Sequence, residues 1–314
     1  MACVLVKGLD DLPDAAHGCV LSIGNFDGVH RGHQQILSLA RRLADERKTH
    51  LLCVTFDPPP AALVRADHVR QLITPLAVRC ALLRQHGADF CGVVQTSLEF
   101  LSIEADEFVR QVQAKLRCVA MVEGPDFFFG KGRHGNVELL RSLAVELHFE
   151  VAQVAPEMIE LPGAGAVRVS SSLIRRLITQ GDVEQAATCL GRSFVLYGRV
   201  VAGEQRGRQL NFPTANVDAG DMVLPGDGVY AGRAAVAGRQ FASAISIGVK
   251  PTFGAMARCV EAHLLDAQGD FYDQGIEVTF LQRLRGQQKF ASAEDLTTQI
   301  SKDVQRAREI AARM

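Results

Sequence analysis

Two histidines at a spacing of three, His30 and His33, stand in the stretch LSIGNFDGVHRGHQ. A short apolar run leads into a turn that contains Gly24 and Gly28, and an amphipathic stretch follows, so we expect both histidines in the first turn of a helix. Side chains three residues apart on a helix point the same way. Because a helix N-terminus attracts phosphate oxygens, the pair predicts a triphosphate site in which imidazoles stabilise charge on phosphorus or on departing pyrophosphate.

Other interpretations of this pair are weaker. Metal ligation is disfavoured because a helix N-terminus repels cations and no third ligand or HExxH pattern lies nearby. Purely structural histidines remain an alternative, and a dinucleotide-binding site lacks the GxGxxG that should follow the strand. The GxGxxG at Gly130–Gly135 comes later, so we interpret it as a glycine-rich surface loop; a contact of Lys131 or Arg133 with nucleotide stays open.

A serine–arginine cluster, RVSSSLIRR, begins at Arg168. Its three serines precede a helical run and offer an N-cap and hydroxyl donors, and Arg175 and Arg176 add guanidinium groups suited to phosphate. Capping alone accounts for one serine. The combination predicts a phosphate clamp.

A third candidate site lies in the stretch GEQRGRQLNFPTAN. Gly203 and Gly207 allow backbone amides to approach phosphate closely, and Arg208 adds charge. The proline of FPTAN stiffens a turn that presents Thr214 and Asn216, whose spacing of two puts both on one face of an extended chain. Oxygen donors together with nucleotide phosphates are the usual ligands of Mg²⁺, so we predict a metal–nucleotide site; a capped β-turn is the alternative.

Glu261 and His263 alternate with apolar residues in the stretch CVEAHLLD, so both leave the same face of a predicted strand. Glu261 is placed to accept a proton from an alcohol that attacks a γ-phosphate. The pattern alone favours a solvent-facing acid.

The elements around the histidine pair alternate between short apolar runs and amphipathic stretches, which predicts a doubly wound parallel sheet. Ligands of such sheets bind at the carboxyl ends of strands. Strands are expected at Cys19–Ile23, Leu51–Phe56, Phe90–Val94, Val119–Val122 and Val151–Val154, and helices near Gly32–Arg47, Leu76–His86, Ala105–Leu116 and Val137–Leu147.

The sequence pattern changes after about residue 185. Short segments with β-strand patterns, separated by Gly, Pro, Asp and Asn, predict an antiparallel barrel or sandwich. Ala293–Arg313 is again helical in pattern, and Leu173–Ala187 resembles a helical connector. We therefore expect an α/β chain of two domains, residues 1–186 and 187–314.

The composition of the 314 residues is ordinary for a water-soluble protein, with 47% hydrophobic and 22% charged residues and a net charge of −1. This charge disfavours nucleic acid as a partner, and no apolar run reaches the length of a membrane span. The start of the chain lacks the pattern of a signal peptide, and the eight scattered cysteines include no CxxC pair. We expect a cytoplasmic protein with reduced cysteines and no structural zinc.

The segments GNFDGVHRGHQ, TFDP, EGPDFFFG and VSSSLIRR, in this order, resemble the adenylyltransferase module of the bacterial bifunctional riboflavin kinase/FMN adenylyltransferases (FAD synthetases), which belongs to the HxGH nucleotidyltransferases. The family commonly has histidine where this chain has Pro59, and SST where it has SSS. The resemblance implies the following site: Gly24, Phe26, Asp27, His30 and His33 around ATP, Asp126 near adenine and ribose, and Arg168, Ser171, Ser172 and Arg175 in a flexible phosphate-binding loop.

The segments GxxxGRxLxFPTAN, GVYAG, SIGVKPTFG and VEAHLLDAQGDFYDQGIEVTF resemble the riboflavin kinase module of the same family, with Ser246 in place of a common Asn and Asp273 in place of a common Gly. The resemblance implies a six-stranded antiparallel barrel with a C-terminal helix. It also implies these roles: Thr214 and Asn216 as ligands of Mg²⁺ and ATP, Glu261 as the base that activates riboflavin, and Gly203, Gly207 and Arg208 in the ATP phosphate loop.

The expected function is therefore phosphorylation of riboflavin by ATP to FMN, followed by adenylylation of FMN by ATP to FAD with release of pyrophosphate. One alternative is another HxGH nucleotidyltransferase, of cytidylyl or pantetheine-adenylyl type, whose barrel only binds flavin; FPTAN and Glu261 argue against it. The second is a flavin-binding regulator without catalysis, which the intact His30 and His33 disfavour. The sequence leaves the oligomeric state open.

Overall fold

The computed structural model describes residues 4–6, 11–12, 14–64, 71–202, 214–252 and 255–313. The chain forms two compact units. The first unit comprises Met1–Arg70 and Pro75–Ser170, and the second comprises Gln71–Thr74 and Ser171–Met314. Among the helices that the structure describes, none is long and apolar enough to cross a membrane.

The first unit contains a sheet of six parallel strands in the order β1-β4-β3-β2-β5-β6, as the sequence pattern predicts for a doubly wound sheet. The strands are β1 (Val4–Val6), β2 (Val20–Ile23), β3 (Leu51–Asp57), β4 (Phe90–Gln95), β5 (Ala120–Glu123) and β6 (Glu150–Gln153). Chain order reverses at β2, which has β3 on one side and β5 on the other. The carboxyl end of β2 is therefore the switch point where ligands of such sheets bind.

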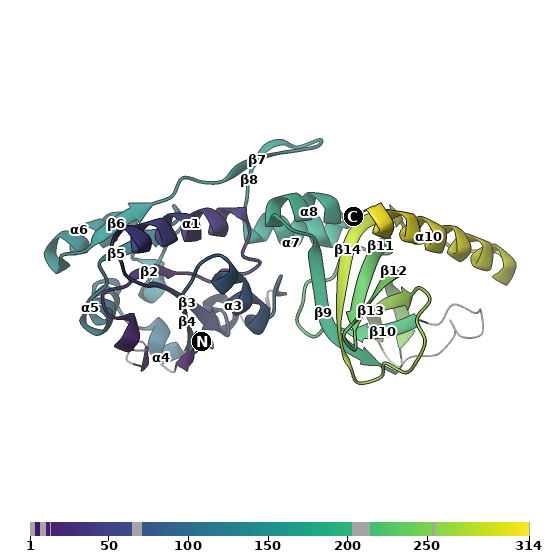
Figure 1. Cartoon of the computed structure of the whole chain (residues 1–314), viewed down its shortest axis with the longest axis horizontal. Coiled ribbons are helices and arrows are strands. Elements are labelled where there is room, and N and C mark those ends of the chain that lie inside the picture. Colours follow the sequence, from purple (N-terminus) through teal and green to yellow (C-terminus); the bar gives the residue numbers. More distant parts are fainter. Residues whose placement is uncertain are drawn as a thin grey trace. The chain divides into compact units, whose positions relative to one another are not determined.

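Helices cover both faces of this sheet (Figure 1). On one face α1 (Arg31–Glu46) and α3 (Leu76–Gln85) enclose one apolar core, and on the other α5 (Ala105–Leu116) and α6 (Val137–Leu147) enclose a second core. The central strands β2, β3 and β5 are buried on both sides, which explains why they appear in the sequence as continuous apolar runs. The remaining elements are α2 (Pro60–Val64), α4 (Leu98–Leu101), the short 3-10 helices η2 (Asp14–Ala16) and η3 (Lys131–Arg133), and the hairpin of β7 (Met158–Leu161) and β8 (Gly165–Arg168).

The second unit is built on a closed antiparallel barrel of six strands in the order β10-β13-β12-β11-β14-β9. This confirms the six-stranded antiparallel barrel that the family resemblance implies, and decides between the barrel and the sandwich that the strand pattern alone left open. The strands are β9 (Phe194–Val201), β10 (Thr214–Asp218), β11 (Gly228–Val236), β12 (Arg239–Thr252), β13 (Ala255–Leu264) and β14 (Gly275–Arg285). Two helices, α7 (Ser171–Gln180) and α8 (Val183–Leu190), precede the barrel within the same unit.

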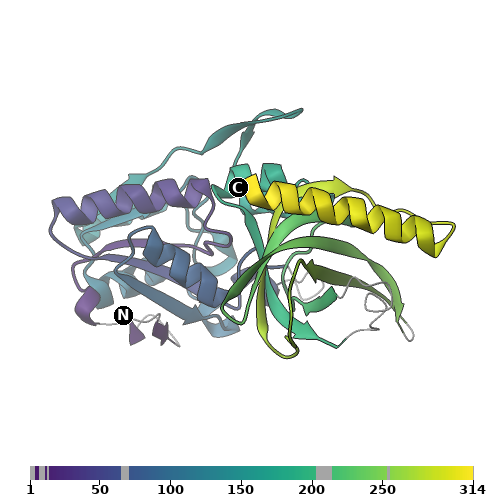
Figure 2. The same ribbon diagram turned by 45° about the vertical axis from the view of Figure 1, so that its right-hand side comes forward.

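The C-terminal helix α10 (Ala293–Arg313) lies along the outside of β11, β12 and β14 (Figures 1 and 2). Ala307 and Ile310 bury its apolar side against the strands. Beside them a shielded ion pair joins helix to barrel, because Arg285 on β14 donates from Nη2 to Oδ2 of Asp303 at 2.7 Å. The predicted terminal helix is thus confirmed. The predicted domain boundary at residues 186/187 stays a prediction.

Candidate functional site

A strained turn carries the chain from β2 to the histidine pair. Phe26, Gly28 and Val29 have φ angles of 47°, 86° and 38°, in the left-handed region that a β-branched residue rarely adopts. Phe26 and Val29 are nevertheless buried, with 2% and 0% of their surface exposed, so packing holds the turn in this shape. His30 follows with extended backbone and caps α1, because its Nδ1 accepts a hydrogen bond from the His33 amide at 3.4 Å.

The two imidazoles lie in parallel contact. The ring centroids of His30 and His33 are 3.6 Å apart and their planes differ by 16°, while the ring centroids of Phe26 and His33 are 5.3 Å apart in an edge-to-face arrangement. Glycine at position 32 leaves room for this stack, since a Cβ there would lie 3.3 Å from the His30 ring. The prediction that both side chains point the same way is confirmed, and the pair lies at the carboxyl edge of the sheet where a phosphate site is expected.

The electrostatics of the pair favour a neutral His33. Burial lowers its pKa well below the ordinary value near 6.5, and the charges of His30 and of Arg79 lower it further. Within the described part of the chain, its buried Nδ1 has no hydrogen-bond partner. A neutral imidazole has one N–H to donate, and near neutral pH His33 therefore acts as a hydrogen-bond donor rather than as a cation.

Arg79 on α3 is a residue that our sequence analysis missed. It is 0% exposed, and its Nη1 donates to Thr55 Oγ1 and to the Phe56 carbonyl, both at 3.2 Å. Thr55 Oγ1 in turn donates to the carbonyl of Asn25 in the histidine turn, at 3.1 Å. The signal was present in the sequence, because Leu76, Arg79, Cys80 and Leu83 fit the i, i+3, i+4, i+7 pattern, which puts the arginine in the middle of an apolar stripe.

Two further residues of the predicted nucleotide site come together in the first unit. Arg168 at the end of β8 and Asp126 after β5 form a two-pronged ion pair, with Nη1 3.2 Å from Oδ1 and a closer contact between Nη2 and Oδ2. Their side chains are 41% and 66% exposed, so the pair contributes little to stability in water. The roles predicted for both residues stay predictions.

The remaining predicted residues of this site are spread over several elements. Gly24 continues the ladder of β2, since its amide donates to the Val54 carbonyl at 3.0 Å, and Asp27 is buried in the turn. Ser171 and Ser172 open α7, and Arg175 on that helix donates from Nε to the Gln71 carbonyl at 2.8 Å. In the glycine-rich loop, Lys131 pairs with Glu104 at 2.8 Å and the Arg133 guanidinium lies 4.9 Å from the Phe128 ring centre, as a surface loop would have it.

The strand register of the barrel brings the second set of predicted residues together. Asn216 on β10 pairs directly with Glu261 on β13, and Glu261 pairs on its other side with Ser246 on β12. Directly opposite residues of antiparallel strands share a face. Val260 and Ala262 are buried inside the barrel, so Glu261 projects from its outer face together with Asn216 and, two residues earlier, Thr214.

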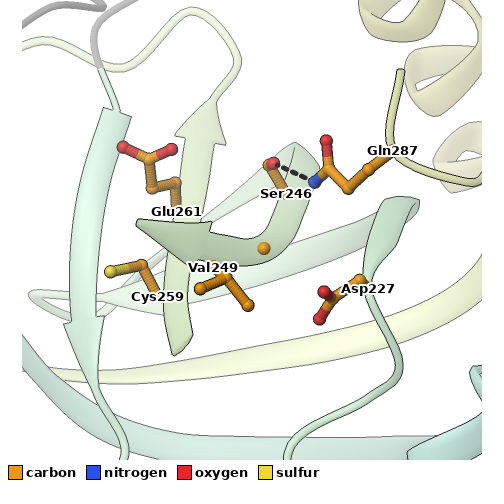
Figure 3. A pocket seen from close by; sticks show the side chains of 7 residues that line it. Asp227, Ser246, Val249, Cys259, Glu261 and Gln287 are labelled. Atoms are coloured by element: carbon orange, nitrogen blue, oxygen red, sulfur yellow. Dashed lines mark hydrogen bonds between the residues drawn. The ribbon is translucent and has the colours of Figure 1, made fainter. Parts of the chain in front are cut away.

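A cavity of about 380 Å³ lies against this outer face (Figure 3). Glu261 and Cys259 lie on one side of it, and Asp227 and Gln287 on the other (Figure 3). Gln287 donates from Nε2 to the Ile247 carbonyl at 2.6 Å and to Ser246 Oγ at 3.2 Å, which fixes that wall. Among the described residues, Ser246, Gly248 and Val249 also line the cavity. Such a volume with a few polar groups is typical of a small-molecule site.

Asp227 and Gln287 were not among the predicted site residues, because neither lies in a recognisable motif. Gly203, Gly207 and Arg208, the predicted phosphate loop of this site, lie outside the described residues. Their assignment stays a prediction. The described residues contain no cluster of three or more His, Cys, Asp or Glu side chains that could hold a metal ion.

Comparisons with known proteins find two family matches that together cover most of the chain. The FAD synthetase family matches residues 12–172, and the riboflavin kinase family matches residues 190–311. The chain is 34% identical over 308 residues to a bifunctional riboflavin kinase/FMN adenylyltransferase of Escherichia coli, covering 97% of both chains. It is 38% identical over 318 residues to the protein of that name in Pseudomonas fluorescens, covering 98% of both.

A solved structure matches the fold over nearly its whole length. It is the crystal structure of a protein from Streptococcus pneumoniae that its title calls a macrolide-efflux protein. The TM-score is 0.88 at 27% sequence identity, with 98% of this chain and 99% of the other covered. Both units described above thus recur together in another protein.

Proposed function

This chain belongs to the family of bifunctional riboflavin kinase/FMN adenylyltransferases, and we propose that its two compact units divide the two reactions between them. The enzyme phosphorylates riboflavin with ATP to give FMN, and then adenylylates FMN with a second ATP to give FAD and pyrophosphate. The observation that carries the division is the presence of a polar site in each unit: the stacked imidazoles of His30 and His33 in the first, and the Glu261 cavity in the second.

Adenylyl transfer is assigned to the histidine pair. A phosphate oxygen of FMN attacks the α-phosphorus of ATP, a new P–O–P bond forms, and the bond to pyrophosphate breaks. The imidazole N–H groups and the N-terminus of α1 stabilise the negative charge that develops on the departing pyrophosphate. Arg168 supplies a further donor to the phosphates in this proposal, and Gly24, Phe26, Asp27 and Asp126 contact the rest of the nucleotide. The phosphate-binding role that the resemblance implies for Ser171, Ser172 and Arg175, which belong to the second compact unit, stays a prediction.

Phosphoryl transfer is assigned to the outer face of the barrel. The carboxylate of Glu261 accepts the proton of the riboflavin 5′-hydroxyl while that oxygen attacks the γ-phosphorus of ATP and ADP leaves. The cavity beside Glu261 receives the flavin, with Gln287 and Asp227 as its polar wall. Gly203, Gly207 and Arg208 hold the ATP phosphates in this proposal.

The donor set on β10 fits Mg²⁺. The Thr214 hydroxyl and the Asn216 amide oxygen are hard donors on one face of one strand, and both side chains are only half-buried, so phosphate oxygens can complete the coordination. A bound Mg²⁺ would neutralise phosphate charge during the transfer. Thr214 and Asn216 then serve to orient the nucleotide toward Glu261, which stands opposite Asn216 in the register.

The test is a time course of flavins separated by chromatography after purified protein receives riboflavin, ATP and Mg²⁺. We expect FMN to appear first and FAD later. A variant with both His30→Ala and His33→Ala should accumulate FMN and form no FAD, while His17→Ala, an exposed histidine of the same unit, should behave as wild type. Loss of both activities in the double variant would contradict two separate sites, and wild-type protein that never forms FMN would contradict the kinase assignment.

Cytoplasmic localisation and the absence of nucleic-acid partners rest on the composition and stay predictions. The substrates riboflavin, FMN and ATP follow from the family.

A further inference from the structure

The most unusual buried group outside the predicted site is the guanidinium of Arg79. It is the largest of the fully buried side chains that the structure describes, and it belongs to α3, which the motifs of the family do not include. Its Nε and Nη2 have no hydrogen-bond partner among the described residues, and no described carboxylate pairs with it. A guanidinium remains protonated in proteins, and a buried cation without an ionic partner is costly. The cost of burying this guanidinium suggests that Arg79 serves the function of the first unit.

The bonds that Arg79 does make lead to the histidine turn. Nη1 donates hydrogen bonds to Thr55 Oγ1 and to the Phe56 carbonyl at the carboxyl end of β3. Thr55 Oγ1 in turn donates a hydrogen bond to the Asn25 carbonyl. This chain of hydrogen bonds ties α3 and β3 to the strained segment that ends at His30. Arg79 is therefore anchored to the backbone whose shape places the imidazole pair.

Arg79 and His33 both have buried nitrogen atoms without a hydrogen-bond partner among the described residues, and no hydrogen bond joins the two side chains. His33 has a buried Nδ1 without a partner, and a neutral imidazole with its proton on Nε2 presents a lone pair at Nδ1. Arg79 has unused N–H groups and lies close enough for its charge to act on His33. The positive charge of Arg79 acts on His33, and the tautomer with its lone pair at Nδ1 leaves the Nε2–H free to meet a phosphate oxygen.

We propose that Arg79 is a positioning residue of the adenylyltransferase site, which acts through His33 and the Thr55–Asn25 link rather than by touching ATP. Its buried charge favours the neutral His33 imidazole and adds a positive potential, unscreened by solvent, behind the phosphate site. The charged and titratable groups that act on His33 are His30 on the same turn and Arg79 from α3, and Phe26 adds an apolar edge. The proposal rests on the assignment of FMN adenylylation to this unit.

The experiment compares Arg79→Met, Arg79→Lys and Thr55→Val with Arg84→Met, whose arginine is exposed on the same helix. We follow the His33 imidazole by NMR against pH, and measure kcat and KM for ATP in FMN adenylylation. In Arg79→Met the pKa of His33 should rise and kcat/KM should fall by about 10²-fold, on the scale of a lost transition-state donor. Arg79→Lys should keep the pKa of His33 low, because lysine retains the positive charge although it lacks the planar guanidinium group. It should recover at least about tenfold of the kcat/KM that Arg79→Met loses.

Thr55→Val separates the two parts of the proposal. It should leave the His33 titration unchanged and lower kcat, because it loosens the turn and keeps the charge. If Arg79→Met does not fold, Arg79→Lys decides alone: a low His33 pKa with measurable adenylylation supports the proposal, and an ordinary pKa overturns it. An Arg79→Met protein that titrates and turns over as Arg84→Met does would also overturn it. Failure of the wild type to make FAD from FMN would instead overturn the adenylylation assignment itself.

Discussion

His30 occupies the N-cap of α1 and also belongs to the imidazole pair, so its replacement should have two effects that can be separated. Its Nδ1 accepts the His33 amide, and the loss of an N-cap side chain costs about 0.5–2 kcal/mol of stability. The 3.4 Å length of this bond puts the expected cost at about 0.5–1 kcal/mol, which lowers the melting temperature of the first unit by about 1–4 °C. The loss of a donor to developing phosphate charge should lower kcat by about 10²–10³-fold.

Two substitutions distinguish these effects. His30→Ala removes both the cap and the imidazole, whereas His30→Asn removes the imidazole but restores a side chain that is among the strongest helix caps. We expect both variants to lose FAD formation by about 10²–10³-fold, while only His30→Ala lowers the melting temperature. The assays are FAD formation from supplied FMN and ATP, and calorimetry of the same samples.

The control is riboflavin phosphorylation, which should keep its wild-type rate in both variants because it is assigned to the other unit. If His30→Asn restored adenylylation together with the melting temperature, the imidazole would be only a helix cap. The interpretation of the stacked pair as a phosphate site would then be refuted.

Three further predictions test other parts of the structure. Glu261→Ala should slow FMN formation by about 10²-fold or more and leave FAD formation from supplied FMN intact, and a normal kinase rate would remove Glu261 from the mechanism. Asp303→Asn removes the negative charge that pairs with Arg285, whose side chain is only 15% exposed, and should lower the free energy of unfolding of the barrel by about 3–5 kcal/mol in urea unfolding. The control Asp266→Asn, in the exposed pair with Arg308, should leave the free energy of unfolding unchanged. Burial raises the pKa of Glu123 well above its ordinary value near 4.5. The folded state therefore binds the proton of the Glu123 carboxyl group more tightly than the unfolded chain does, and the stability of the protein should fall as pH rises from about 4.5 through the folded pKa. Glu123→Gln should flatten that slope in melting curves between pH 5 and 8, and an unchanged slope would exclude Glu123 as its source.

The sequence was sufficient where a local pattern determines the structure. The apolar run of β3 and the amphipathic stretch of α1 predicted both elements, and the spacing of His30 and His33 predicted their shared direction. The closure of the barrel could not be predicted from the residues, because alternating short strands are equally compatible with a sandwich. The strand β1 was missed since its three residues form no periodic pattern.

Sites that depend on partners far apart in the chain escaped the sequence. Arg79 meets Thr55 across 24 positions, and its burial follows from the packing of α3 on the sheet. Asp227 and Gln287 enter the cavity because β11, β12 and β14 are neighbours in the barrel, an arrangement that no short motif encodes. Site residues whose partners lie far apart in the chain can be identified only when the strand order is known.

The first strand of the barrel, β9, is bonded to β10 on one side and to the last strand, β14, on the other. During synthesis on a ribosome, the barrel therefore cannot close until residue 285 has emerged, whereas every strand of the parallel sheet is available by residue 153. The order of the chain lets the sheet complete its pairing while the barrel strands still expose unpaired edges, which is the state most open to aggregation and to chaperones. Nascent chains halted shortly before β14 should therefore be the ones that chaperones hold longest.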